Sequence, residues 1–170
     1  MKIFLLGMPA VGKTTLGKAL AVHLTLPFFD LDEEIAKATA NTSKVIFESK
    51  GEAYFRKIET SVLHTLISDK QTFIMATGGG TPCFYDNLTL MNKVGLTVFL
   101  YLPIATLVRR LSKLAIAQRP LLTSVTPSEL DAALRNMLQQ RMSHYLQAKT
   151  IVSKASLTTE VLIKNVRVLF

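Results

Sequence analysis

A glycine-rich segment near the start of the chain has the residue types and the spacing that bind a chain of phosphates. It has the form G-x-x-x-x-G-K-T and begins at Gly7. Backbone N–H groups in such a loop turn toward phosphate oxygens, Lys13 supplies a positive charge, and the Thr14 hydroxyl can complete the coordination of Mg²⁺. A plain glycine turn with one exposed lysine is the less favoured alternative, because every defining position of the motif matches. The residues predicted to hold a nucleoside triphosphate are Gly7, Ala10, Val11, Gly12, Lys13, Thr14 and Thr15.

Two carboxylates, Asp30 and Asp32, follow a short apolar segment of strand length. Alternation along an extended chain would place both on one side, with Leu31 on the other. One carboxylate near a metal ion and one near an acceptor hydroxyl is an arrangement suited to phosphorylating an alcohol. The simpler alternative is that Asp32 caps the helix that follows, while Asp30 is solvated.

Three further groups could bind an anionic acceptor. Arg56 and Glu59 share a helix face, where a surface ion pair is the simpler interpretation. The glycines at 78–80 follow a predicted strand and expose backbone N–H groups, although a plain turn is the alternative. Arg119 and Arg141 each carry a planar fork that fits carboxylates and phosphates, although single arginines are more often solvated. Arg141 lies within the apolar stripe of its predicted helix.

Apolar segments alternate with helical patterns, which predicts a parallel sheet with helices on both faces. The predicted strands are residues 2–6, 27–29, 72–76, 97–101 and 150–152. The predicted helices are residues 14–24, 33–38, 43–50, 53–67, 104–111, 127–146 and 158–169.

Two neighbouring segments are predicted to be a loop and the start of a helix. In residues 112–125, apolar side chains do not recur at the spacing of a helix or a strand, and Pro120 would interrupt a helix. This segment is therefore predicted to be a mobile loop that closes over a nucleotide. The next helix is predicted to begin with Thr126 as its cap, Pro127 in its first position and Glu129 closing a capping box.

Composition narrows the class of protein. The 170 residues, 49% of them hydrophobic, predict one globular domain over residues 1–170. No apolar segment is long enough to span a bilayer. The net charge of +8 is scattered along the chain, which disfavours nucleic-acid binding and suits small anionic substrates. Cys83 is the single cysteine, which fits a reducing compartment such as the cytoplasm, and we expect it to pack as a small apolar residue.

Taken in order, these motifs resemble those of shikimate kinases, which belong to the nucleoside-monophosphate-kinase-like group of P-loop folds. The resemblance implies a three-layer α/β fold with a central five-stranded parallel sheet, an acceptor-binding section at about 31–59 and a lid at about 112–125. It also implies a monomer that uses ATP and Mg²⁺ to phosphorylate the 3-hydroxyl of shikimate, in the shikimate pathway of aromatic amino-acid biosynthesis. The matching motifs lie at residues 7–14, Asp30 and Asp32, Phe55, Arg56 and Glu59, 78–80, 119–122, and Arg141 and Tyr145.

The resemblance also implies residue roles. Lys13 and Arg119 would stabilise the transferring phosphoryl group, with Arg119 delivered by the lid and also contacting ATP. Thr14 and Asp30 would serve Mg²⁺, Asp30 through water. Asp32 would orient or deprotonate the acceptor hydroxyl, and Glu59 would position Arg56. The residues implied to hold shikimate are Asp32, Arg56, Gly78, Gly79, Gly80 and Arg141.

Two departures and two alternatives accompany this interpretation. Ala10 and Val11 stand where the family's loop has glycine or another small residue, and Ala148-Lys149 replaces a frequent Ala-Asp pair. A gluconate-kinase-like enzyme of the same fold is the alternative among kinases. A catalytically silent nucleotide-binding module is the alternative outside enzymes, and it is disfavoured because Lys13, Asp32 and Arg119 are all present.

Overall fold

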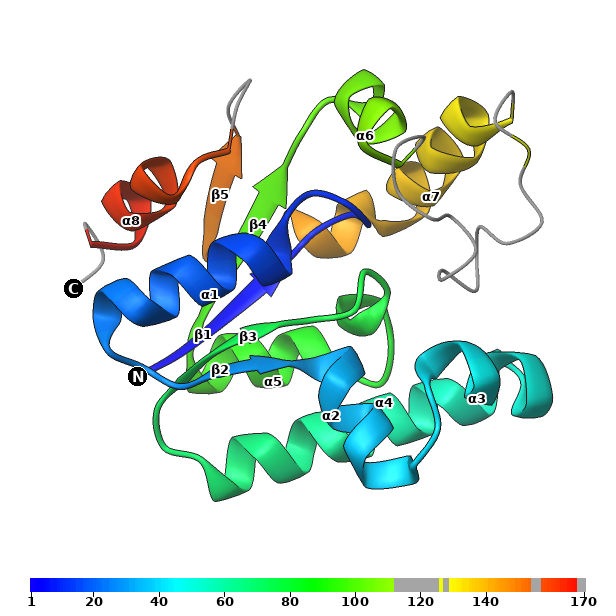
Figure 1. The fold of residues 1–170 in the computed structure, drawn as a ribbon, viewed down its shortest axis with the longest axis horizontal. Helices are drawn as coiled ribbons and strands as arrows, with labels where there is room; N and C mark the ends of the chain where they lie inside the picture. Colours follow the sequence, from blue (N-terminus) through cyan, green and yellow to red (C-terminus); the bar gives the residue numbers. More distant parts are fainter. Residues whose placement is uncertain (112–125, 127–128, 154–156, 168–170) are drawn as a thin grey trace.

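The structure, a computed structural model, describes residues 1–111, 126, 129–153 and 157–167 (Figure 1). Five strands form one sheet in the order β2-β3-β1-β4-β5, and every neighbouring pair is parallel. Every residue of β3 is buried, and so are all but one in β1 and in β4, as expected for strands covered on both faces. The predicted five-stranded parallel sheet is therefore confirmed. The strands are β1 (Lys2–Leu6), β2 (Phe28–Asp30), β3 (Phe73–Ala76), β4 (Leu96–Tyr101) and β5 (Thr150–Ser153).

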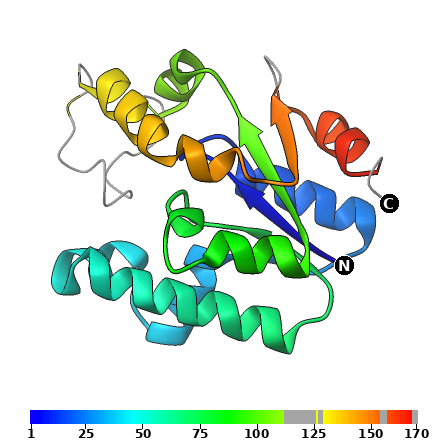
Figure 2. The same ribbon diagram turned by 180° about the vertical axis from the view of Figure 1, so that it is seen from behind.

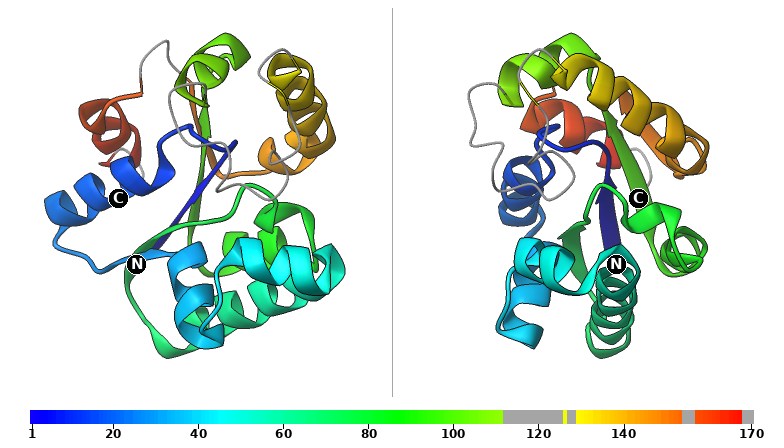
Figure 3. Two further views of the ribbon diagram at one scale, coloured as in Figure 1. Left: turned by 45° about the vertical axis from the view of Figure 1, so that its right-hand side comes forward. Right: turned by 90° about the vertical axis from the view of Figure 1, so that its right-hand side faces the viewer.

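Helices cover both faces of the sheet. α1 and α8 pack together on one face, and α5 lies on the other (Figures 1 and 2). Figure 3 shows α2, α3 and α4 grouped on one side of the molecule, with α6 and α7 grouped on the other. The helices are α1 (Lys13–Leu24), α2 (Leu31–Thr39), α3 (Ser43–Lys50), α4 (Glu52–Asp69), α5 (Asn87–Val94), α6 (Ile104–Leu111), α7 (Leu130–Tyr145) and α8 (Thr159–Arg167), with a 3₁₀ turn, η1 (Thr81–Cys83).

The register of the strands brings the predicted site residues to one edge of the sheet. Ala76 of β3 pairs with Leu5 of β1 and with Asp30 of β2. The chain segments that follow these three strands therefore leave the sheet side by side. In parallel sheets, ligands bind where such segments leave the carboxyl ends of the strands.

The structure contains two elements that the sequence did not predict, α5 and η1. α5 is only eight residues long, and its N-cap, Asp86, has a left-handed backbone and makes no side-chain capping bond. It therefore lacks both the length and the start signal by which a helix is found in a sequence.

Two predicted helix starts are revised. α2 begins at Leu31, two residues before the predicted start, because Asp30 caps it. α7 is described from Leu130, and Glu129 accepts hydrogen bonds from the backbone N–H and hydroxyl of Thr126 at 3.1 and 2.6 Å. The predicted contact between Thr126 and Glu129 is therefore present, but the N-cap of the described helix is Glu129 and not Thr126. Residues 127–128 and the predicted lid at 112–125 lie outside the described residues. Among the described helices, none is long and apolar enough to cross a membrane.

Aromatic rings connect the central strands. Phe73 on β3 is fully buried, and its ring meets those of Phe4 and Phe29 edge to face, with centroids 5.5 and 5.8 Å apart. Such pairs stabilise beyond the area they bury. The rings thus couple β1, β2 and β3, whose carboxyl ends carry the predicted site.

We expect Phe73→Ala to lower the free energy of unfolding by about 3–5 kcal/mol, because it leaves a cavity between three strands. Urea denaturation followed by circular dichroism measures this change. Val22→Ala on α1 is the matched control, since Val22 is 83% exposed and its loss should change stability by no more than about 0.5 kcal/mol. Equal losses in the two variants would contradict the described packing.

Candidate active site

The loop between β1 and α1 has the backbone that a phosphate-binding loop requires. Gly7, Ala10 and Gly12 all have positive φ, at 138°, 61° and 107°. A side chain at Gly7 would also collide with the carbonyl oxygen of Leu100, 2.5 Å from an ideal Cβ. Gly12 is the N-cap of α1 and offers no side-chain cap, so the first N–H groups of the helix are left for a bound anion.

Two cations contact the carbonyl groups of this loop. The Lys13 ammonium donates to the carbonyls of Gly7 and Met8 at 2.8 and 3.0 Å. Arg110 of α6 donates through Nη1 to the carbonyls of Ala10 and Val11 at 3.1 and 3.0 Å. Sequence reasoning gave Arg110 no role in the site, because only the tertiary structure brings α6 to the loop.

Val11 departs from the small residue expected in the loop, yet it is accommodated. Its side chain is fully buried and belongs to the hydrophobic core, so it points away from the phosphate-binding side. The substitution therefore adds core contacts and leaves the loop backbone intact.

Thr14 and Asp30 form a pair of oxygen donors. The Thr14 hydroxyl donates to Asp30 Oδ2 at 2.6 Å, and both residues line a cavity with Gly12 and Lys13. We call this hollow, of about 540 Å³, the phosphate cavity. A hydroxyl and a carboxylate are the hard donors that suit Mg²⁺, which usually takes one or two protein oxygens and completes its shell with water and phosphate. The described residues hold no cluster of three or more His, Cys, Asp or Glu that could cage a metal ion.

Asp30, and not Asp32, caps the helix that follows β2. Asp30 Oδ1 accepts from the backbone N–H of Asp32 at 3.1 Å. The alternative in which Asp32 caps that helix and Asp30 is solvated is therefore wrong. The argument from strand alternation also fails, because the helix begins at Leu31, but both carboxylates still line the phosphate cavity.

A second hollow, of about 560 Å³, adjoins the phosphate cavity and contains both buried arginines of the site. We call it the arginine cavity. Its lining includes Arg56 and Arg141, together with Ser43 and Phe47 of α3. Three residues line both hollows, and these are Asp32, Gly78 and Gly79. The two hollows therefore adjoin at this shared wall, and a ligand in one would lie next to a ligand in the other.

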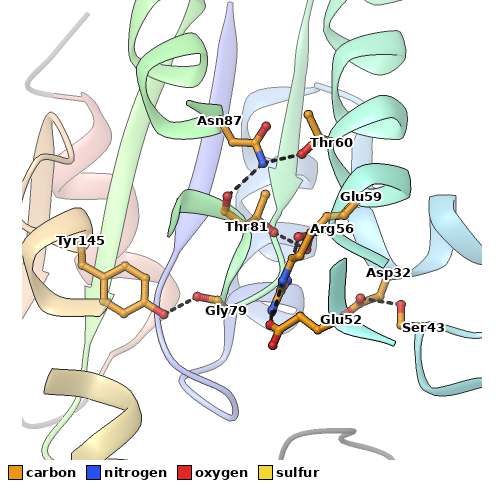
Figure 4. A network of polar contacts seen from close by, with 10 residues as sticks. All are labelled: Asp32, Ser43, Glu52, Arg56, Glu59, Thr60, Gly79, Thr81, Asn87 and Tyr145. Carbon is orange, nitrogen blue, oxygen red and sulfur yellow. Dashed lines mark hydrogen bonds and ion pairs between the residues drawn. The ribbon is translucent and has the colours of Figure 1, made fainter. Parts of the chain in front are cut away.

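Arg56 is 4% exposed, so the surface ion pair considered for it is wrong. Its Nη1 donates to Glu59 Oε2 at 2.8 Å, and its Nε and Nη2 donate to Glu52 Oε1 at 3.2 and 3.0 Å (Figure 4). The guanidinium also lies 4.5 Å from the centroid of the Phe84 ring. These contacts hold the guanidinium in one orientation at the wall of the arginine cavity.

The Glu59 carboxylate also accepts a hydrogen bond from η1. Its Oε1 accepts from the Thr81 hydroxyl at 2.6 Å, and the Thr81 carbonyl accepts from Asn87 at 3.0 Å (Figure 4). Burial raises the pKa of the Glu59 carboxyl above its ordinary value, while the Arg56 charge and the Thr81 hydroxyl oppose that rise. Neither Thr81 nor Asn87 carries a sequence signal, because η1 and α5 were not predicted.

The glycines at 78–80 leave room for charged side chains. An ideal Cβ would lie 2.6 Å from Glu59 Oε1 at Gly78, 2.9 Å from Arg141 Nη1 at Gly79 and 2.5 Å from Arg56 Nη2 at Gly80. Any other residue would displace one of these three groups. A plain turn would not require glycine at each position, so the packing itself explains the motif.

α7 supplies the second arginine and its support. Arg141 is 8% exposed, which agrees with its place in the apolar stripe. One turn later, the Tyr145 hydroxyl donates to the carbonyl of Gly79 at 2.6 Å (Figure 4). Burial raises the pKa of Tyr145 to about 12, so its hydroxyl remains a donor at neutral pH. Arg141 and Tyr145 thus approach the glycines from the same helix.

The remaining predicted residues have mixed outcomes. Thr15 and Ala10 line the phosphate cavity, whereas Gly7 and Val11 are not among its lining residues. Cys83 is half-buried and burial raises the pKa of its thiol, while its packing role stays a prediction. Arg119 lies outside the described residues, and its role stays a prediction.

Comparisons with known proteins agree with this geometry. The family model for shikimate kinase matches residues 9–169. The shikimate kinase of Bacteroides thetaiotaomicron is 42% identical over 151 residues, which are 89% of this chain and 85% of that protein. The shikimate kinase of Azobacteroides pseudotrichonymphae is 38% identical over 164 residues, covering 96% of each chain.

Two solved structures share the fold over nearly the whole chain. The crystal structure of the Bacteroides thetaiotaomicron shikimate kinase has a TM-score of 0.89 at 38% identity, covering 99% of this chain and 97% of that one. The Acinetobacter baumannii shikimate kinase, solved in complex with shikimate, has a TM-score of 0.88 at 33% identity, covering 99% and 91%. The sequence resemblance is confirmed, and the chain belongs to the shikimate kinase family.

Proposed function

We propose that the chain transfers the γ-phosphoryl group of ATP to the 3-hydroxyl of shikimate, giving shikimate 3-phosphate and ADP. The observation that carries this proposal is the shared wall of the two cavities. Asp32 and Gly79 line both, so a phosphate chain and a hydroxy acid would meet there. Phosphoryl transfer depends on such positioning more than on covalent help from the protein.

The acceptor would enter the arginine cavity with its carboxylate toward Arg56 and Arg141. A planar guanidinium group binds a carboxylate through two parallel hydrogen bonds. Both arginines are buried, and Arg56 is held by its ion pair with Glu59. The glycines at 78–80 would let the ring of the acceptor approach the backbone closely. Glu59 would act through Arg56, keeping its charge paired and its orientation constant.

At the shared wall, the Asp32 carboxylate would accept the proton of the acceptor hydroxyl. The hydroxyl oxygen would bond to the γ-phosphorus of ATP as the bond from that phosphorus to the bridging oxygen breaks, and ADP would leave with that oxygen. Lys13 would stabilise negative charge on the transferring group. Arg119 would add a second positive charge when the predicted lid closes.

Thr14 and Asp30 fit a site for Mg²⁺, with Asp30 acting through water. When bound, the ion neutralises charge on the phosphate chain of ATP. The loop N–H groups and the first turn of α1 would hold the same phosphates from the other side.

A gluconate-kinase-like activity remains the alternative, since gluconate is also a hydroxy acid. Two buried arginines beside three glycines, together with membership of the shikimate kinase family, favour shikimate as the acceptor. We further propose that the protein acts as a monomer in the cytoplasm.

We expect ADP release from ATP and Mg²⁺ to depend on shikimate and to fall to background in Lys13→Ala. A coupled assay with shikimate, gluconate or no acceptor, run side by side, measures this. ATP binding without shikimate-dependent turnover would support the nucleotide site and reject shikimate as the acceptor.

Asp32→Asn should lower kcat by about 100-fold or more, because general base catalysis contributes about 10²–10⁴. The dissociation constant for ATP should stay within about threefold, because the phosphates are held by the loop. Steady-state kinetics and nucleotide titration give the two values. Near-wild-type kcat would show that Asp32 is not the catalytic carboxylate.

Arg141→Ala should raise the KM for shikimate about tenfold or more while the KM for ATP changes little, since a charged hydrogen bond contributes about 1.5–3 kcal/mol. Arg135→Ala on the same helix is the control, because the Arg135 side chain is 63% exposed and pairs with Asp131. An unchanged KM for shikimate in Arg141→Ala would count against binding of the shikimate carboxylate by Arg141.

A further inference from the structure

Ser43, the first residue of α3, makes a hydrogen bond that crosses to another helix. Its hydroxyl donates to Asp32 Oδ1 of α2 at 2.9 Å, and both residues line the arginine cavity (Figure 4). Ser43 thus contacts the carboxylate that the proposed reaction uses.

α3 does not need this hydroxyl for its own stability. Thr42 is its N-cap and accepts from the backbone N–H of Val45 at 3.3 Å. The other serine of the helix, Ser49, donates to the Val45 carbonyl at 2.6 Å, which is the ordinary partner within a helix. Ser43 differs because its hydroxyl donates to the carboxylate of Asp32 on another helix.

The contact completes a chain of hydrogen bonds that begins at the phosphate loop. Thr14 donates to one oxygen of Asp30, and the other oxygen accepts from the backbone N–H of Asp32. The backbone of Asp32 is therefore held from the nucleotide side and its side chain from α3. Within the described part of the chain, Ser43 is the hydrogen-bond donor to this carboxylate, which leaves Oδ2 for a ligand.

An aspartate carboxylate rotates broadly about its last bond unless a partner holds it. A hydrogen bond to an ionised carboxylate is about twice as strong as a neutral one. Misplacement of a catalytic group by about 1 Å can lower a rate about 100-fold. A donor on Oδ1 thus has a direct consequence for where Oδ2 points.

We propose that Ser43 is a positioning residue, which orients the Asp32 carboxylate so that Oδ2 faces the acceptor hydroxyl. This inference rests on the proposed function, because it assigns a support to the carboxylate that acts there. Ser43 acts through Asp32 and has no separate chemical step.

Ser43→Ala should lower kcat about tenfold while the KM values for ATP and shikimate stay within about threefold. Ser43→Thr restores the hydroxyl and should recover kcat to within about threefold of the original. Ser49→Ala is the matched control on the same helix and should leave all three constants unchanged. Thermal unfolding of each variant checks that the fold is retained.

Combining Ser43→Ala with Asp32→Asn separates positioning from an independent role. If Ser43 acts through Asp32, the second change should lower the kcat of Asp32→Asn by less than about twofold. A further tenfold loss in that background would overturn the proposal, and so would an unchanged kcat in Ser43→Ala. A rise in the KM for shikimate alone would also overturn it, since Ser43 would then be a binding contact.

The same series distinguishes this inference from the proposed function. Full activity in Asp32→Asn rejects Asp32 as the catalytic carboxylate and the inference with it. A large loss in Asp32→Asn with no loss in Ser43→Ala rejects the positioning role alone.

Discussion

The buried ion pair between Arg56 and Glu59 constrains much of the surrounding structure. A buried charge that loses its partner costs about 3–5 kcal/mol, so both groups must stay paired and fully hydrogen-bonded. Glu52 and Thr81 supply further hydrogen bonds to the pair, and within the described part of the chain two N–H groups of the Arg56 guanidinium are left for a ligand. A Cβ at Gly78 or Gly80 would collide with these same groups, whereas one at Gly79 would collide with Arg141. The ion pair therefore explains why two of the three positions suit glycine, and it ties the 3₁₀ turn to α4 through the Thr81 hydroxyl.

The parallel sheet determines the position of the residues that line the two cavities. Its central strands end at the same edge, so the phosphate loop, the two aspartates and the glycines leave the sheet together. Two cavities then share a wall without any insertion between them. The site is rigid on the sheet side and is completed by helices, which bring Arg110, Arg141 and Ser43 from other parts of the chain.

Asp30 shows how one residue can serve both the fold and the site. One of its oxygens caps α2 and the other accepts from Thr14. Capping moves the start of the helix to Leu31 and turns Asp32 into its first turn, where it faces Ser43. The same bond that stabilises the helix thus places the backbone of Asp32 where its carboxylate can accept from Ser43.

The sequence by itself determined the phosphate loop, the alternation of strands and helices, and the order of the motifs, because these depend on local spacing and hydrophobic period. Only the tertiary structure decided that Arg56 is buried, that Asp30 caps α2, and that Ser43, Thr81 and Arg110 belong to the site. Thr81 lies in a turn without a periodic pattern, and Ser43 and Arg110 reach partners distant in sequence. Such contacts arise from packing between elements, and no local spacing encodes them.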